Sequence, residues 1–195
     1  MSSHHIVKEN QEPALLVMQA SSMAAEDLGQ LLEWSPTIIT DPASYADLTA
    51  QGIKVDLLFS NTAVHLSQEH IQVISYPGDF LTAAFQYLIA HNFKAVNIIT
   101  DSFPEALILS FADQLNIVIL GNGKRIITAK SGYEKWKPKG EHIHILSPVE
   151  GLEVRGLTNV SSVTADVDAA YVTVADGFYG VQFSKPIFCL LAEEI

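Results

Sequence analysis

The chain has 195 residues, 48% of them apolar, which is enough to bury a substantial core in one large domain or two small ones. It carries 22 acidic and 11 basic residues, so its formal charge of −11 repels phosphate backbones and anionic lipids and argues against nucleic-acid and membrane binding. No apolar run is long enough to cross a bilayer, and the first residues lack the layout of a signal peptide, so we expect a cytoplasmic protein.

The first two thirds of the chain alternate strand-like runs with helix-like segments. Each run is short, apolar and bounded by polar or turn-forming residues, as buried strands are. Strands that alternate with helices pair in parallel through right-handed crossovers, so we expect an open, mostly parallel α/β sheet with helices on both faces. The predicted strands are Leu15–Met18, Thr37–Thr40, Val55–Ser60, Gln72–Tyr76, Val96–Thr100 and Asn116–Leu120.

Helix signals lie between these strands. We expect Ser21 or Ser22 to cap a first helix, because a hydroxyl accepts a hydrogen bond from an unpaired N–H of the first turn. Asp79 is expected to cap a second helix, whose apolar residues between 81 and 88 recur at helical spacing. Pro104 suits the first position of a third helix, which its apolar sequence predicts to be covered on most sides.

Beyond about residue 120 the pattern changes to short β-like runs without helical spacing. Asn122-Gly123 between two apolar runs is typical of a tight hairpin turn, and Lys124 lacks the following Ser or Thr of a phosphate-binding loop. We therefore predict an α/β domain at residues 1–122 and an all-β sandwich domain at residues 123–195.

Four aspartates are candidates for catalysis: Asp41, Asp56, Asp79 and Asp101. Asp41 and Asp101 directly follow predicted strands, and ligands of open parallel sheets bind at the carboxyl edge. Carboxylates gathered there could hold Mg²⁺ on a polyphosphate. Asp41 and Asp101 equally suit a turn or a helix cap, so a structural role is the alternative.

Two further features carry weaker signals. His142 and His144 share one face of a strand and could hold a metal with a third ligand, but two exposed histidines on an edge strand are the commoner arrangement. Cys189, the single cysteine, lies among large apolar residues, an environment that raises the pKa of a thiol and makes it inert.

The order of these segments resembles the thiamin pyrophosphokinase family over nearly the whole chain. The resemblance rests on QLLEWSPTIIT followed by an aspartate, GIKVDLLFS, IQVISYPGDFLTAAFQYLIAHNFKAVNII, YEKWKPKGEHIHILSP and VEGLEVRGL. It implies an α/β catalytic domain, a thiamin-binding β-sandwich, a homodimer with thiamin between the subunits, and transfer of diphosphate from ATP to thiamin with Mg²⁺.

The family's catalytic motifs are eroded in this chain. The Gly-Asp-Phe-Asp-Ser motif, whose aspartates help to bind Mg²⁺ and ATP, reads Ser-Asn-Thr-Ala-Val at residues 60–64. The Asp-Lys-Thr-Asp motif falls at about residues 77–80 and retains at most one acid, Asp79. The Gly-Gly-Arg-x-Asp-His motif meets residues 101–105 without its arginine or histidine. Two aspartates that the family also has, Asp41 and Asp56, are present in this chain, and Asp56 is a candidate metal ligand. The resemblance also implies that Ser161 and Ser162 contact thiamin.

Loss of one catalytic electrostatic group typically costs about 2.7–4 kcal/mol in transition-state stabilisation, and several are missing here. The leading hypothesis is therefore a catalytically silent thiamin pyrophosphokinase-like homodimer that acts as a binding or regulatory module. One alternative is an active thiamin diphosphokinase in which the four aspartates rebuild a site for Mg²⁺ and ATP. The other is a binder of a different small molecule in the interdomain cleft.

Overall fold

The computed structural model describes residues 12–160 and 169–195, which fall into two compact units. The first unit runs to Asp101 and includes Asp113–Asn116, and the second comprises Ser102–Ala112 and Ile117–Ile195. Within the described ranges, no helix has both the length and the apolar character needed to cross a membrane. The predicted domain boundary between residues 122 and 123 stays a prediction.

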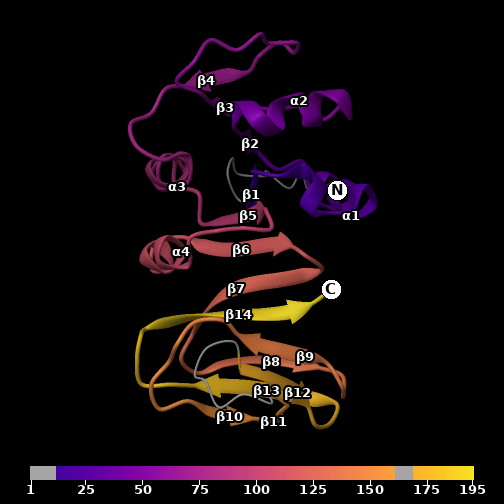
Figure 1. The fold of residues 1–195 in the computed structure, drawn as a ribbon, viewed down its shortest axis with the longest axis vertical. Helices are drawn as coiled ribbons and strands as arrows, with labels where there is room; N and C mark the ends of the chain where they lie inside the picture. The colour runs from indigo at the N-terminus through magenta and orange to yellow at the C-terminus, as the bar shows by residue number, and fades with distance from the viewer. Residues whose placement is uncertain (1–11, 161–168) are drawn as a thin grey trace, which may run out of the picture. The chain divides into compact units, whose positions relative to one another are not determined.

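Five parallel strands form the centre of the first unit (Figure 1). The strands lie in the order β4-β3-β2-β1-β5, and each neighbouring pair is parallel. Every strand lies within two residues of its predicted ends, because short apolar runs between polar residues mark buried strands well. The strands are β1 (Ala14–Val17), β2 (Ile38–Thr40), β3 (Leu57–Phe59), β4 (Gln72–Ile74) and β5 (Ala95–Ile99).

The first helix does not begin as predicted. Helix α1 (Ala25–Leu32) has Ala24 at its N-cap, without a side-chain cap. The expected capping serines lie instead in a short 3-10 turn, η1 (Ala20–Ser22), which precedes the helix. Acidic residues in the first turn of α1 still complement the positive end of its dipole.

Asp41 and Asp79 each cap a helix. Asp41 precedes α2 (Pro42–Ala50), a helix that the sequence analysis did not predict, and Asp79 precedes α3 (Phe80–Ala90), as expected. A proline at the first position of α2 fits its helix start, since that residue needs no N–H partner.

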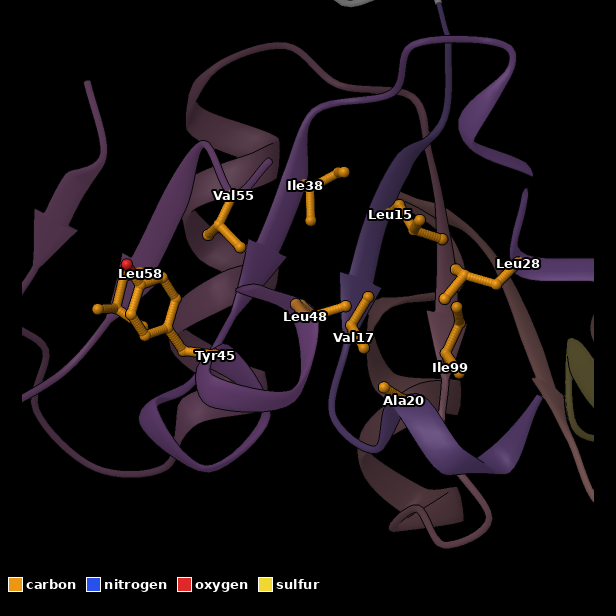
Figure 2. Packing of buried hydrophobic residues seen from close by; sticks show 10 residues of the cluster. All are labelled: Leu15, Val17, Ala20, Leu28, Ile38, Tyr45, Leu48, Val55, Leu58 and Ile99. Carbon is orange, nitrogen blue, oxygen red and sulfur yellow. The ribbon is translucent and has the colours of Figure 1, made fainter. Parts of the chain in front are cut away.

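Strands β1, β2 and β3 are buried on both faces, and on β3 neighbouring residues contact helices on opposite sides of the sheet. On β3, Leu58 packs in a cluster with Leu48 of α2, whereas the adjacent Phe59 meets Tyr87 of α3 edge-on at 5.8 Å between ring centroids. Burying one such leucine side chain fully stabilises the fold by about 1.5–3 kcal/mol. Figure 2 shows the α1 and α2 side of this core, which consists of Leu15, Val17, Ala20, Leu28, Ile38, Tyr45, Leu48, Val55, Leu58 and Ile99.

In the described residues of the second unit, the strands pair antiparallel in two groups, and one short helix is present. One sheet has the strand order β6-β7-β14-β9-β12-β11, and the other has β10-β13-β8. The chain is thus α/β, with a sheet that carries helices and a further antiparallel sheet. The elements are α4 (Glu105–Phe111), β6 (Asn116–Gly121), β7 (Lys124–Lys130), β8 (Tyr133–Lys137), β9 (His142–Ile145), β10 (Glu153–Arg155), β11 (Leu157–Asn159), β12 (Ala169–Thr173), β13 (Gly177–Gln182) and β14 (Phe188–Glu194).

The predicted hairpin turn is confirmed. Strands β6 and β7 pair up to Gly121 and Lys124, and the two residues between them, Asn122 and Gly123, have φ angles of 50° and 67°. Positive φ at both central positions is the requirement of a type I′ turn, whose twist matches that of the flanking strands.

Two details of the second unit differ from the sequence analysis. Pro104 is the N-cap of α4 and not its first helical residue, and Ile108 is the buried residue of this helix, so α4 is less covered than predicted. The strand that carries His142 and His144 is not at an edge, because β9 pairs with β12 on one side and β14 on the other. Apolar content and histidine spacing do not reveal which strands become neighbours.

Candidate functional site

The carboxyl ends of the five parallel strands define the candidate functional site, which we call the carboxyl edge. Asp41 follows β2, Asn61 follows β3 after one residue, and Asp101 follows β5 after one residue. Parallel strands bring these positions to the same edge of the sheet, where α/β proteins bind ligands.

Two of the candidate carboxylates at this edge hold helix termini. Asp41 Oδ1 accepts a hydrogen bond from the N–H of Ser44 at 2.9 Å, and Asp79 Oδ1 accepts one from Thr82 at 2.8 Å. The bonds from Thr82 hold the pKa of Asp79 below its usual value. Both carboxylates therefore have a structural task, since they satisfy N–H groups that a helix cannot pair internally.

Asn61 is committed to the backbone. Its Nδ2 donates to the carbonyl of Tyr76 at 2.8 Å, and its Oδ1 accepts from the N–H of Tyr76 at 2.9 Å. The neighbouring Ser60 hydroxyl donates to the Thr62 carbonyl at 2.8 Å and accepts from the Thr62 N–H at 3.1 Å. The turn after β3 thus uses its polar side chains to fix its own conformation.

Asp101 lies at the carboxyl edge as predicted and is exposed. Its Oδ2 lies 3.5 Å from Nε2 of Gln19, which follows the end of β1. This contact links the loops after two neighbouring strands, β1 and β5.

Asp56 lies at the opposite end of the sheet. It precedes β3, and its carboxylate accepts a hydrogen bond from the N–H of Ile38, the first residue of β2, at 3.0 Å. In the register of β2 and β3, Asp56 lies beside Ile38, which is three residues before Asp41. Asp56 and Asp41 are therefore roughly 10 Å apart along the strand direction. Asp56 and the aspartates of the carboxyl edge cannot share one metal ion.

The four aspartates therefore do not form one site. In residues 12–160 and 169–195, no group of three or more His, Cys, Asp or Glu side chains is placed so that it could hold a metal ion. The residues at the carboxyl edge do not fit a Mg²⁺ site built from several carboxylates. The predicted thiamin-contacting residues, Ser161 and Ser162, lie outside the described residues.

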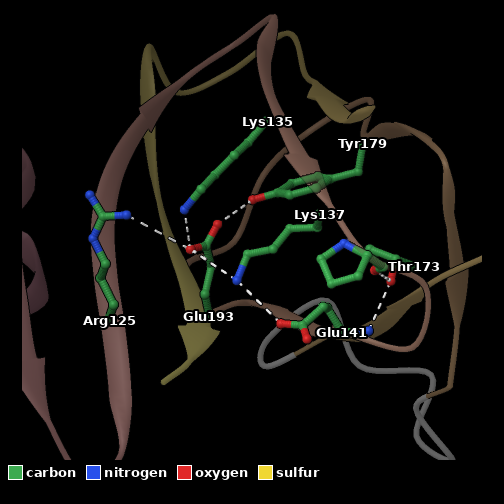
Figure 3. Close-up of polar contacts among 8 residues, drawn as sticks. Arg125, Lys135, Lys137, Glu141, Thr173, Tyr179 and Glu193 are labelled. Atoms are coloured by element: carbon green, nitrogen blue, oxygen red, sulfur yellow. Dashed lines mark hydrogen bonds and ion pairs between the residues drawn. The ribbon is translucent and has the colours of Figure 1, made fainter. Parts of the chain in front are cut away.

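A second polar group, which the sequence analysis missed, lies inside the second unit (Figure 3). We call it the Glu193 cluster: Glu193, Arg125, Lys135, Lys137 and Tyr179. The Glu193 side chain is 2% exposed, and its Oε2 lies 3.6 Å from Lys137 Nζ and 3.9 Å from Arg125, and pairs closely with Lys135. Its other oxygen accepts a hydrogen bond from Tyr179 at 2.8 Å.

Burial alone would raise the pKa of Glu193. The hydrogen bonds from Lys135 and Tyr179, together with the charges of Lys135 and Lys137, outweigh burial. The pKa of Glu193 therefore lies below its usual value. The same burial, together with the bond to Glu193, raises the pKa of Tyr179. Glu193 therefore stays ionised and Tyr179 stays protonated, which fits a structural ion pair better than a group that exchanges protons. The signal in the sequence is that Glu193 has the same strand parity as buried Cys189 and Leu191.

Comparison with solved structures shows that the chain has the fold of thiamin pyrophosphokinases. The enzyme from Geobacillus thermodenitrificans matches with a TM-score of 0.72 and 12% identity, over 94% of this chain and 98% of that one. The Bacillus subtilis enzyme matches with 0.67 and 13%, over 94% and 99%, and the yeast enzyme with 0.67 and 13%, over 97% and 88%. The predicted resemblance is thus confirmed at the level of the fold, with widely diverged sequence.

No protein-family model matches the chain, and no curated protein matches its sequence.

Proposed function

We propose that this protein is a thiamin pyrophosphokinase-like homodimer without diphosphotransferase activity, which acts as a binding or regulatory module in the cytoplasm. The observation that carries the proposal is the hydrogen bonding of Asn61, which replaces a family aspartate and uses both polar atoms on the Tyr76 backbone. The Asn61 amide oxygen is uncharged and already accepts a hydrogen bond, so it is a weaker ligand for Mg²⁺ than the carboxylate it replaces.

The other carboxylates support the same proposal. Asp41 and Asp79 cap helices, and Asp56 lies at the far end of the sheet. Diphosphoryl transfer depends almost wholly on positioned charge and metal ions. Loss of each such group typically reduces the rate by a factor of about a hundred to a thousand, so several losses together leave little activity.

The preserved fold supports a function other than diphosphate transfer. Strands β1, β2 and β3 stay buried on both faces, and the second unit keeps an apolar cluster among its strands. Folds commonly host functions other than the one for which they are known. A ligand related to thiamin is the candidate we propose first, because the solved structures with this fold are named as thiamin pyrophosphokinases.

Purified protein incubated with ATP, Mg²⁺ and thiamin tests the catalytic part, with the Bacillus subtilis enzyme as positive control. We expect thiamin diphosphate at less than about a thousandth of the control rate, since more than one electrostatic group is missing. Formation at the control rate would contradict silence and favour the alternative, an active enzyme with a rearranged site for Mg²⁺ and ATP.

Binding and assembly are tested separately. Thermal unfolding with thiamin, thiamin diphosphate and ATP should show a rise in Tm for a thiamin compound, because a ligand at a hundred times its Kd adds about 2.7 kcal/mol of stability. Light scattering should give twice the mass of one chain. A monomer, or no shift with any thiamin compound, would contradict the corresponding part of the proposal.

A further inference from the structure

The amino ends of the parallel strands enclose a cavity far from the carboxyl edge. Its volume is about 810 Å³, within the usual range for small-molecule sites. It is lined by the segments that leave α1 and α2 on their way into β2 and β3. Its walls include Leu32, Pro36, Ile38, Ile53, Lys54 and Asp56.

The cavity lies at the negative ends of two helices. Leu32 is the last residue of α1, and Gln51, which directly follows α2, also lines the cavity. A helix carboxyl end carries roughly half a negative charge, and neither helix has a basic residue in its last turn to offset it. The Asp56 carboxylate adds a full negative charge that Lys54 offsets, so a cation that displaces Lys54 meets a negative potential.

The carboxylate of Asp56 is held ready to bind. Oδ2 accepts the hydrogen bond from Ile38 N–H at 3.0 Å, which fixes the orientation of the group. Oδ1 pairs with Lys54 Nζ at 2.6 Å, but the Lys54 side chain is 69% exposed. The Asp56 side chain is 28% exposed, but an ion pair with one well-solvated partner still contributes little stability. Another cation can therefore replace Lys54 at Oδ1 at small cost.

The apolar wall is part of the rigid core. Leu32 and Ile53 are partly buried and pack against the cluster drawn in Figure 2, and Pro36 also lines the cavity. An apolar ligand body placed on this wall would cover surface that is now partly in contact with water.

We propose that this cavity binds a small organic cation, in which an ammonium or amidinium group pairs with Asp56 and an attached apolar ring lies against Leu32, Pro36 and Ile53. The site is independent of the proposed function, because it lies at the other end of the sheet and needs no diphosphate transfer.

Phenethylammonium is a suitable probe, and 2-phenylethanol and phenylacetate are its neutral and anionic counterparts. In an NMR titration of the full chain, phenethylammonium should shift the amide signals of Ile38, Gly52 and Ile53 in a saturable manner. The two counterparts should bind at least about tenfold more weakly, since they lack the charge-assisted bond. Equal binding of all three probes, or no shift at these amides, would overturn the proposal.

Two variants test the role of charge in opposite directions. Asp56→Asn keeps an oxygen that accepts from Ile38 but lacks the charge, and should weaken phenethylammonium binding about tenfold or more. Lys54→Met removes the competing cation and should tighten binding severalfold. Asp47→Asn, a matched change at an exposed residue of α2 outside the lining, should leave affinity unchanged. Weaker binding by Lys54→Met would show that Lys54 does not compete with the probe for Asp56, and the proposal would fall even if Asp56→Asn were unstable.

Discussion

Asn61 and Tyr76 are joined by two hydrogen bonds in which a side-chain amide takes the place of a strand residue. The pairing of β3 with β4 ends at Phe59 and Ile74, and the amide of Asn61 continues it beyond the strand ends. Only a group with both a donor and an acceptor can do this, and an ionised carboxylate has no donor. Asn61 thus holds the turn after β3 together.

Asn61→Asp should destabilise the protein at pH 7 by about 1–2 kcal/mol, because the bond to the Tyr76 carbonyl is lost and a carboxylate faces that oxygen. The loss relative to wild type should shrink near pH 3, where a protonated carboxyl group can donate again. Urea unfolding at both pH values measures this difference. Asn116→Asp, an exposed control, should change stability by less than about 0.5 kcal/mol. An unchanged stability of Asn61→Asp at pH 7 would contradict the structural role.

Asp79→Ala should lower the free energy of unfolding by about 0.5–2 kcal/mol, because the Thr82 N–H loses its cap. Asp79→Asn is the matched control, since an amide oxygen still accepts this bond. The pKa of Asp79 is lowered in the folded state. The stability that the ionised Asp79 contributes is therefore complete above its unfolded-state pKa and is lost as the pH falls through its folded-state pKa. Equal destabilisation by alanine and asparagine would show that the carboxylate has another task.

Cys189 should not react with a thiol reagent in the native protein at pH 8. The residue is completely buried, and burial raises the pKa of its thiol to about 11, so the reactive thiolate is both scarce and shielded. Ellman's reagent should label it only as fast as the protein opens, and immediately in urea. Ser110→Cys, at an exposed position of α4, should react at once in the native state. Rapid native labelling of Cys189 would contradict this burial.

The sequence predicted the strands of the first unit well because each is a short apolar run. It did not predict α2, because the buried positions of this helix include Ser44, whose hydroxyl donates to the Met18 carbonyl at 2.7 Å. That bond joins residues 26 positions apart, so the polarity of Ser44 hides an inward-facing position. Local spacing cannot show that a distant carbonyl will satisfy a buried hydroxyl.

The candidate site was predictable in part. The sequence placed Asp41 and Asp101 after strands and identified their alternative as turns or caps, and the structure assigns Asp41 to a cap. It kept Asp56 among the candidates because the family resemblance retains this aspartate, although Asp56 lies at the amino end of the predicted strand Val55–Ser60. The Glu193 cluster also escaped it, because Lys135 and Glu193 are 58 residues apart and lie on strands of two different sheets, β8 and β14, which do not pair with each other.

Glu193→Gln should lower the free energy of unfolding at pH 7 by roughly 2–4 kcal/mol. Removing one partner of a fully buried ion pair typically costs about 3–5 kcal/mol. We expect somewhat less here, because Lys135 and Lys137 are partly exposed to water. The pKa of Glu193 is lower in the folded state than in the unfolded state. The stability that the ionised Glu193 contributes is therefore complete above the unfolded-state pKa of about 4.3, and it is lost as the pH falls through the folded-state pKa. The difference between wild type and variant should therefore be constant from pH 7 to about pH 5 and shrink below about pH 4.3.

The neighbouring Glu194 supplies the matched control for this experiment. It lies on the same strand, but its side chain is 56% exposed and its contact with His144 is long, at 3.9 Å. Glu194→Gln should change stability by less than about 0.5 kcal/mol at every pH, because an exposed charge gains little from one distant partner. If both variants lost the same stability, or if the effect of Glu193→Gln did not depend on pH, the ion pairs of Glu193 would not be what stabilises this part of the second unit.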